Sequence, residues 1–314
     1  MTKSKPSRLK ITPYRVLMLI LLLVAIYFLL PQFSDFHVTM HVLLHSSWLW
    51  VIAGIIASAL TFMSAAVTQF AAGNSIGKFS DITWLQFAGS FVDHFLPFSL
   101  GALGMNTEYY HKLGKLRSQA FAIAIIPTVF GAITTILLVL IISPITLIKL
   151  EQSIRGNPKI RIISLIVGIC IVLALLALPL YLKYLKNFYK EGLQGLKAIQ
   201  NYHQMAIVFI GSIAITLFST LALYTSINAI HAHVALLAVI ILYITAALVS
   251  NVAPTPGGLG ATEAALIIGL SSAGLTLSQA VACTLIYRFV SFWLPLLPGA
   301  YALRRVNKRH LLTD

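Results

Sequence analysis

Apolar runs long enough to cross a lipid bilayer follow one another along most of this chain, and they constrain its fold more than any other feature. A helix needs about 20 apolar residues to cross hydrocarbon about 30 Å thick. Backbone groups in hydrocarbon must be hydrogen-bonded within their own segment, so each run is predicted to be helical. The predicted spans are Tyr14–Leu30, Trp48–Ala72, Gln119–Ile142, Ile162–Tyr181, Ala206–Ile230, Val234–Ser250, Ala261–Gly274 and Leu277–Leu303.

The composition agrees with a membrane protein. The 314 residues are 59% hydrophobic and 10% charged, whereas soluble domains carry about 25% charged residues. We predict an all-α, polytopic helical membrane protein with about eight transmembrane helices plus broken or re-entrant helices. Residues 14–303 form a single transmembrane domain, between a basic amino terminus (1–13) and a basic tail (304–314).

The net charge of +14 is interpreted as a signal of topology and of contact with anionic lipid, not of nucleic-acid binding. Lysines and arginines gather at both chain ends, which predicts a multi-pass protein of the cell (inner, cytoplasmic) membrane with both termini in the cytoplasm. No small-residue cleavage site follows Tyr14–Leu30, so this run is predicted to be a retained span. Cys170 and Cys283 each lie in an apolar run, so we expect neither a disulfide nor a metal, and no cofactor.

The segment from Ser143 to Arg161 is basic, with Lys149, Arg155 and Lys159, yet the crossing count places it outside the cell. Either Trp84–Gly104 crosses the membrane completely, or this loop departs from the positive-inside tendency. We favour the second alternative, which makes Trp84–Gly104 a re-entrant or broken helix.

Residues 182–202 have the pattern of a basic amphipathic helix. Leucines recur at helical spacing, while Lys183, Lys186 and Lys190 occupy another face. Such a helix lies in the headgroup plane and binds anionic lipid headgroups; a plain cytoplasmic connector is the alternative. Three histidines, at 37, 41 and 45, also share a helical face, and there we favour an interfacial helix over a zinc site.

The break in the apolar pattern between Asn251 and Glu263 is the predicted functional centre. Two prolines stop the preceding helix, and three glycines follow that adopt backbone angles other residues resist. Irregular backbone at membrane depth survives only inside protein or beside water, and such breaks mark binding sites in transporters. The candidate substrate-binding residues here are Asn251, Thr255, Pro256, Gly257, Gly258, Gly260 and Glu263.

Glu263 and Arg288 are predicted to meet. Glu263 is the one formally charged residue between Ala198 and Tyr287, and Arg288 comes next. Counted from the turn near Gly274, Glu263 lies about 17 Å down one helix and Arg288 about 20 Å down the following one, at a rise of about 1.5 Å per residue. Isolated charges at that depth are costly, so we expect an ion pair lining one polar cavity, with either a substrate role or a purely structural one.

A similar break is predicted within Trp84–Gly104, where Asp93 precedes interruptions at Pro97, Gly101 and Gly104. Gly-Ala-Leu-Gly at 101–104, followed by Glu108, echoes Gly-Gly-Leu-Gly at 257–260, followed by Glu263, although the spacing differs by one residue. Paired broken segments point to a transporter site. We therefore add Asp93 and Glu108 to the candidate substrate-binding residues and hypothesise an internal repeat.

The residues of the second break also resemble a known family. Pro256-Gly257-Gly258-Leu259-Gly260-Ala261-Thr262-Glu263, with Tyr287–Pro295 and Gly299 downstream, is similar to the lysylphosphatidylglycerol synthase transmembrane-region family, which includes the flippase part of multiple-peptide-resistance-factor proteins. The resemblance covers most of the chain and is tightest in its last quarter. It implies a flippase of an anionic or aminoacylated phospholipid or a related polar lipid. Many members carry an arginine near the glycine of the first break; here the nearest one downstream is Arg117.

We therefore predict an integral membrane lipid translocase, flippase-like, that moves such a lipid between leaflets, with membrane phospholipid as its partner. The sequence has no nucleotide-binding loop to drive transport. The alternatives are a membrane-embedded transferase acting on a lipid carrier, or an accessory subunit that presents lipid to a separately encoded modifying enzyme. No catalytic motif stands in the apolar runs, so we do not expect an enzyme. A homo-oligomer is left open.

Overall fold

The computed structural model describes residues 36–96, 100–154, 201–253 and 255–312. Within these residues every regular element is a helix, which confirms the predicted all-α membrane architecture. The predicted spans Tyr14–Leu30 and Ile162–Tyr181, and the basic helix with Lys183, Lys186 and Lys190, lie outside the described residues. The elements are α2 (Phe36–Leu44), α3 (Trp48–Ala72), α4 (Phe79–Asp93), α5 (Leu100–Lys112), α6 (Arg117–Ile154), α9 (Tyr202–Ala229), α10 (Leu236–Val252), η3 (Pro256–Gly258), α11 (Ala261–Ser272), α12 (Leu277–Arg288), η4 (Phe289–Trp293) and α13 (Leu294–Lys308).

Four helices of the described part are long and apolar enough to cross a bilayer. They are α3, the first part of α6 (Arg117–Ile141), α9, and the continuous helix Leu277–Lys308 that α12, η4 and α13 form together. Large apolar side chains such as Leu49, Leu217 and Leu297 are exposed on these helices, as expected where helices that satisfy their own backbone face lipid. The chain is thus a multi-pass membrane protein.

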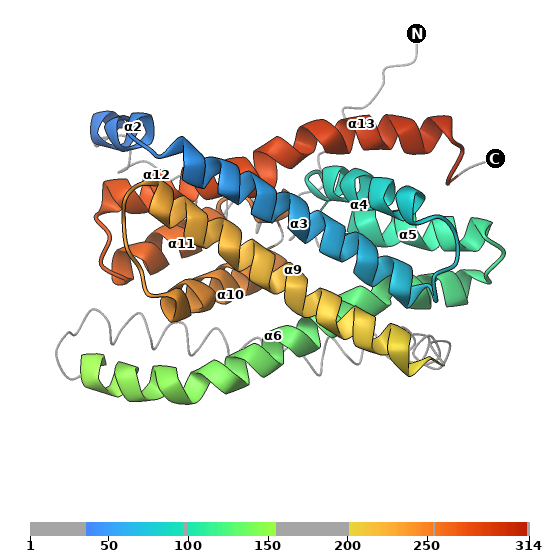
Figure 1. The fold of residues 1–314 in the computed structure, drawn as a ribbon, viewed down its shortest axis with the longest axis horizontal. Helices are drawn as coiled ribbons and strands as arrows, with labels where there is room; N and C mark the ends of the chain where they lie inside the picture. Colours follow the sequence, from blue (N-terminus) through green and yellow to red (C-terminus); the bar gives the residue numbers. More distant parts are fainter. Residues whose placement is uncertain (1–35, 97–99, 155–200, 254, 313–314) are drawn as a thin grey trace, which may run out of the picture.

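α3 and α9 run antiparallel along each other (Figure 1). A glycine in each helix lets the other come close. A Cβ atom at Gly54 would lie 2.9 Å from Thr225 Oγ1, and one at Gly211 would lie 2.2 Å from Thr68 Oγ1. The start of each helix therefore packs near the end of the other, in two contacts of the same kind.

α4 and α5 form a helical hairpin, which confirms the interpretation of Trp84–Gly104 as a broken helix. The arms are antiparallel, because contacts pair residues ever farther from the tip: Gly101 with Val92, Ala102 with Gly89, and Asn106 with Gln86. Close approach of the arms depends on glycine, since a Cβ atom at Gly89 would lie 2.7 Å from Ala102 Cα.

The bounds of this first hairpin differ from the prediction. α4 already begins at Phe79, and α5 continues to Lys112. Gly101 and Gly104 do not interrupt a helix but lie inside α5. Glycine costs a helix only about 1 kcal/mol, so it marks a break less reliably than proline does.

α10 and α11 form a second hairpin around the predicted break. Gly258 packs on Ser250 near the tip and Gly269 on Leu242 farther away, so these arms are antiparallel too. The sequence predicts two separate crossings here, Val234–Ser250 and Ala261–Gly274, whereas neither helix of the hairpin is among the four that are long enough to cross a bilayer. The reason is length: the 12 residues of α11 rise only about 18 Å, short of a bilayer core about 30 Å thick.

The two hairpins enter the bundle from opposite ends. α4 follows the end of α3, and its Asp81 pairs with Arg309, which follows α13. α10 follows the end of α9, where Ser47, just before α3, donates its backbone N–H to the last turn of α9 at 2.7 Å. The tips meet between the ends, because a Cβ atom at Gly257 would lie 3.7 Å from His94 Cα. Opposed hairpins of this kind are typical of inverted repeats in transporters.

The fold supports the hypothesis of an internal repeat, with its halves in opposite orientations. Glu108, however, lies well inside α5 and not in the first turn, where Glu263 lies in α11. The two acids that the sequence pattern pairs are therefore not equivalent in the fold. Three pairs of equivalent positions are separated by the same number of residues. They are Gly54 and Gly211, Thr68 and Thr225, and the helix starts Phe79 of α4 and Leu236 of α10.

α6 is longer than predicted. The sequence predicts a loop from Ser143, whereas the helical backbone continues through Ile154. Residues 145–152 consist mostly of good helix formers, namely Leu, Lys, Glu and Gln. They carry the helix past Pro144, just as the same helix continues past Pro127; an apolar helix tolerates proline where the freed carbonyl finds another partner.

α2 confirms the helix expected around the histidines at 37, 41 and 45, and it packs against α12. The rings of His41 and His45 stack with their centroids 4.0 Å apart, and Nδ1 of His45 lies 2.8 Å from the backbone oxygen of His41. These two imidazoles are thus engaged with their own helix.

Candidate functional site: two cavities between the hairpin tips

Two adjacent cavities between the hairpin tips, here called the tip cavities, form the candidate site. The first has a volume of about 340 Å³ and the second about 290 Å³, near the lower end of the range usual for small-molecule sites, about 300–1,000 Å³. The cavities share a wall of Thr61 and Phe62 from α3, Ser250 and Asn251 from α10, and Ser291 from η4.

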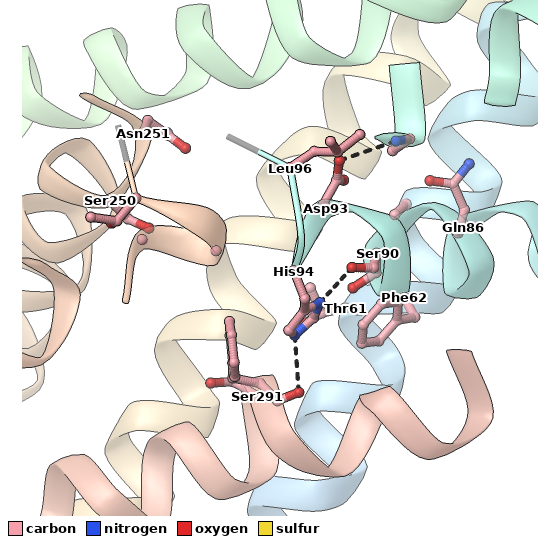
Figure 2. A pocket seen from close by; sticks show the side chains of 16 residues that line it. Thr61, Phe62, Gln86, Ser90, Asp93, His94, Leu96, Ser250, Asn251 and Ser291 are labelled. Atoms are coloured by element: carbon pink, nitrogen blue, oxygen red, sulfur yellow. Dashed lines mark hydrogen bonds between the residues drawn. The ribbon is translucent and has the colours of Figure 1, made fainter. Parts of the chain in front are cut away.

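Both hairpin tips line the first cavity (Figure 2). Asp93, His94 and Leu96 come from the end of α4, while Asn251 and Thr255 come from the opposite tip. Two segments that lie far apart in the sequence thus contribute to one polar space. This arrangement is the one that the paired-break pattern predicts.

The second tip turns on glycine. Gly257, Gly258 and Gly260 have φ angles of 58°, 66° and 84°, a left-handed region that residues with a Cβ atom avoid. The turn is closed by a hydrogen bond from the backbone N–H of Gly258 to Thr255 O at 3.1 Å. Thr262 adds a second one, donating its hydroxyl to Gly258 O at 2.9 Å.

The predicted ion pair between Glu263 and Arg288 is confirmed. Arg288 Nε lies 2.6 Å from Glu263 Oε1, with side chains 8% and 16% exposed respectively. Glu263 Oε2 also accepts the backbone N–H of Gly260 at 2.7 Å and so caps α11. Arg288 Nη2 donates to Gly257 O at 3.3 Å, and the guanidinium lies 4.0 Å from the ring centroid of Phe292. The pair therefore ties α12 to the broken backbone of the second tip.

The two members of this pair differ in their access to the cavities. Arg288 lines the second cavity, whereas Glu263 is among the lining residues of neither. The prediction that both charges line one cavity is therefore met by the arginine alone. Glu263 acts on the site through Arg288 and through the turn that it caps.

The first tip uses its acid differently. Asp93 Oδ1 accepts backbone N–H groups from Gly101 at 2.7 Å and Ala102 at 3.2 Å, so a residue before the turn caps the helix after it. A carboxylate suits this place, because the amino-terminal end of a helix carries partial positive charge. Figure 2 shows the Asp93 side chain directed at the start of α5.

His94 connects the first tip to the last transmembrane helix. Its Nδ1 bonds to the backbone oxygen of Ser90, and its Nε2 lies 3.2 Å from the backbone oxygen of Phe292. The imidazole also packs on the Phe292 ring, with the centroids 4.0 Å apart. Phe292 thus lies between His94 of one tip and Arg288, which holds the other.

Most of the predicted site residues gather here. Asn251, Thr255, Gly257, Gly258 and Asp93 line the first cavity, Pro256 begins the short helix η3, and Gly260 is the N-cap of α11. Glu108 is the exception, because it lies away from the tips and faces Arg117 at 3.8 Å. What these residues bind stays a prediction.

Several lining residues escape the sequence argument. Thr61 and Phe62 lie within the predicted span of α3, Gln86 and Ser90 within α4, and Ser291 within the last helix. A polar residue in an apolar run is the one signal that marks some of them, and it does not say which face of the helix is lined. Only the packing of the helices brings them to the cavities.

The bundle is therefore that of a helical membrane protein with two opposed helical hairpins around polar cavities. The sequence model of the family described as lysylphosphatidylglycerol synthase TM region matches residues 15–299. The chain belongs to this family, as its glycine-rich break and downstream arginine predict. Membership supports a membrane function connected with lipid. A search of curated proteins found no match.

Proposed function

We propose that this protein is a lipid translocase that moves a polar lipid headgroup between the two leaflets. The observation that carries the proposal is the meeting of two opposed hairpin tips around polar cavities within an apolar bundle. A headgroup needs such a polar space to pass through hydrocarbon, and alternating access in known transporters is centred on sites of this construction.

The site offers suitable chemistry for a polar lipid. Hydroxyl and amide groups line the cavities, Arg288 supplies a positive charge, and the apolar outer surfaces of the helices accommodate acyl chains. By the chemistry of these lining groups, anionic, aminoacylated and related polar lipids are all candidate substrates. Transport without modification of the lipid is part of the proposal.

We further propose that the end of the bundle holding the carboxyl terminus faces the cytoplasm. Basic residues of the described part are concentrated there, and basic loops stay in the cytoplasm. Labelling of a single cysteine introduced at Lys308, with an impermeant maleimide in intact cells, would oppose this orientation. The basic residues at this end of the bundle are Lys78, Lys112, Lys115, Arg117, Arg304, Arg305, Lys308 and Arg309.

The translocase proposal is tested with the purified chain in phosphatidylcholine vesicles. Fluorescent headgroup-labelled phospholipid is placed in both leaflets, and dithionite quenches the outer one. We expect quenching to proceed beyond the outer pool in vesicles with protein and to stop there in vesicles without it. Equal extents in the two preparations would refute the proposal, and a new lipid species in mass spectra of the vesicles would favour a transferase instead.

A further inference from the structure

Neutral groups make up nearly all of the polar lining of the tip cavities. They are hydroxyl and amide side chains contributed by several helices. Among the described lining residues the ionisable groups, besides two tyrosines, are Asp93, His94 and Arg288. The neutral set consists of Ser58, Thr61, Gln86, Ser90, Ser219, Ser250, Asn251, Thr255, Thr262 and Ser291.

Asp93, Arg288 and His94 are already engaged by the protein itself. Asp93 accepts two backbone N–H groups, Arg288 pairs with Glu263, and the ring nitrogens of His94 face two backbone oxygens. An ammonium group entering the cavity would meet in Asp93 a carboxylate whose Oδ1 already caps the start of α5. A phosphate would compete with a buried carboxylate for Arg288. Both charged side chains therefore already serve the fold, Asp93 by capping α5 and Arg288 by pairing with Glu263.

Two neutral groups, in contrast, are placed to receive a ligand. Thr255 Oγ1 is buried and, within the described part of the chain, has no hydrogen-bond partner. Asn251 is exposed and lines both cavities. Buried polar atoms in folded proteins nearly always have partners, so an orphaned hydroxyl beside a cavity indicates a partner that arrives with the ligand.

We propose that the tip cavities bind a lipid headgroup rich in hydroxyl groups, a sugar or a polyol, in preference to one that carries an amine. The inference rests on the proposed translocase function and specifies its substrate. A hydroxyl group both donates and accepts a hydrogen bond, as do the threonine hydroxyl and the asparagine amide that await it. A site built to bind hydroxyls rejects ligands that lack them, because its own groups are then left unpaired.

The test compares three lipids in phosphatidylcholine vesicles containing the purified full-length chain. Monoglucosyl diacylglycerol offers a sugar without phosphate, phosphatidylinositol a polyol with phosphate, and lysylphosphatidylglycerol an amine. Periodate oxidises the exposed vicinal diols of the first two, and trinitrobenzenesulfonate reacts with the amine of the third. Neither reagent crosses the membrane, so consumption beyond the outer leaflet reports translocation.

We expect the protein to accelerate the crossing of the two hydroxyl-rich lipids between leaflets. The amine lipid should cross as slowly as it does in protein-free vesicles. Asn251→Leu should slow the crossing of the accelerated lipids about tenfold, the effect of one lost hydrogen bond. Asn307→Leu is the matched control, because Asn307 is exposed on α13 and lines neither cavity. Thermal unfolding of both variants verifies that they fold.

The outcomes separate this inference from the function on which it rests. Faster crossing of lysylphosphatidylglycerol than of both hydroxyl-rich lipids would overturn the inference and leave the translocase standing. No acceleration of any lipid would overturn both. Equal rates for the Asn251 and Asn307 variants would show that the headgroup passes elsewhere, which also overturns the inference. Acceleration of only one of the two hydroxyl-rich lipids supports it and identifies the source as sugar or polyol.

Discussion

The two hairpin tips solve the same problem, a helix that starts in the middle of an apolar bundle, with different chemistry. At the first tip Asp93 supplies a cap made of two hydrogen bonds to α5. At the second tip Glu263 caps α11 with one hydrogen bond and also neutralises Arg288. Asp93 faces the partial positive charge at the start of α5, whereas Glu263 faces the full positive charge of Arg288.

This difference indicates how firmly each tip is held. A helix cap contributes about 1 kcal/mol, whereas removing one partner of a buried ion pair costs about 3–5 kcal/mol. The second tip is moreover bonded to α12 through Arg288, while the first tip reaches η4, which continues α12, through His94 and Phe292. We therefore expect the second tip to be the fixed half of the site and the first tip to be the more easily displaced half.

The strongest test of the comparison removes one charge at the second tip. Glu263→Gln leaves Arg288 buried without its counter-ion, and we expect a loss of about 3–5 kcal/mol in unfolding free energy, measured by chemical unfolding in detergent. The double variant Glu263→Gln, Arg288→Gln should recover much of this loss. Transport that recovers with it marks the pair as structural, and transport that stays lost assigns it a substrate role.

Glu108→Gln is the matched control for that experiment. Glu108 faces Arg117 at 3.8 Å with side chains 40% and 76% exposed, and exposed pairs contribute at most about 1 kcal/mol. A loss as large as that of Glu263→Gln would mean that burial does not set the strength of these pairs, and the argument for a fixed second tip would fail.

The turn of the second tip should be nearly as sensitive as its ion pair. In Gly258→Val the new Cβ atom would lie 2.1 Å from Ser250 Oγ at a φ of +66°, and strain together with overpacking should cost roughly 2–4 kcal/mol. The fall in unfolding temperature measures it. Gly104→Val is the control, because a Cβ atom there meets nothing within 4 Å; similar falls for both variants would make the turn ordinary.

Neutralising the acid of the first tip should matter much less. Asparagine caps a helix about as well as aspartate, so Asp93→Asn should change the unfolding free energy by less than about 1 kcal/mol, and Asp93→Ala by about 1–2 kcal/mol. Chemical unfolding of the two variants beside the wild type provides the values. If Asp93→Asn costs as much as Glu263→Gln, the contrast between the tips disappears.

The smallest effect on stability is expected from the predicted basic helix. Changing Lys183, Lys186 and Lys190 to glutamine should weaken association with anionic lipid by at most about 1 kcal/mol per residue, measured as lipid enrichment after purification. The unfolding free energy should stay unchanged, since the contacts described for the two tips involve none of these lysines. Unaltered lipid enrichment would identify their segment as a plain connector.

Local chemistry made part of the site predictable from the sequence. Proline and glycine locate the second break, and counting turns from Gly274 brings Glu263 and Arg288 to one depth, where the structure pairs them. The arrangement of α10 and α11 as a hairpin was not predictable in that way, because both are apolar and only length opposes two crossings. The contributions of Thr61 and Gln86 depend on which face of a helix packs inward, and that is decided by tertiary contacts alone.

The reciprocal contacts of α3 and α9 have an energetic consequence. Each helix presents a glycine near its start to a threonine near the end of the other, so a half-turn about an axis between them exchanges the two ends of the bundle. A rearrangement that opens the cavities toward one end then has a counterpart, built from equivalent contacts, that opens them toward the other. Equivalent contacts cancel in the energy difference between these two forms, so we expect the unmatched ones, with Arg288 foremost, to decide which leaflet the resting protein faces.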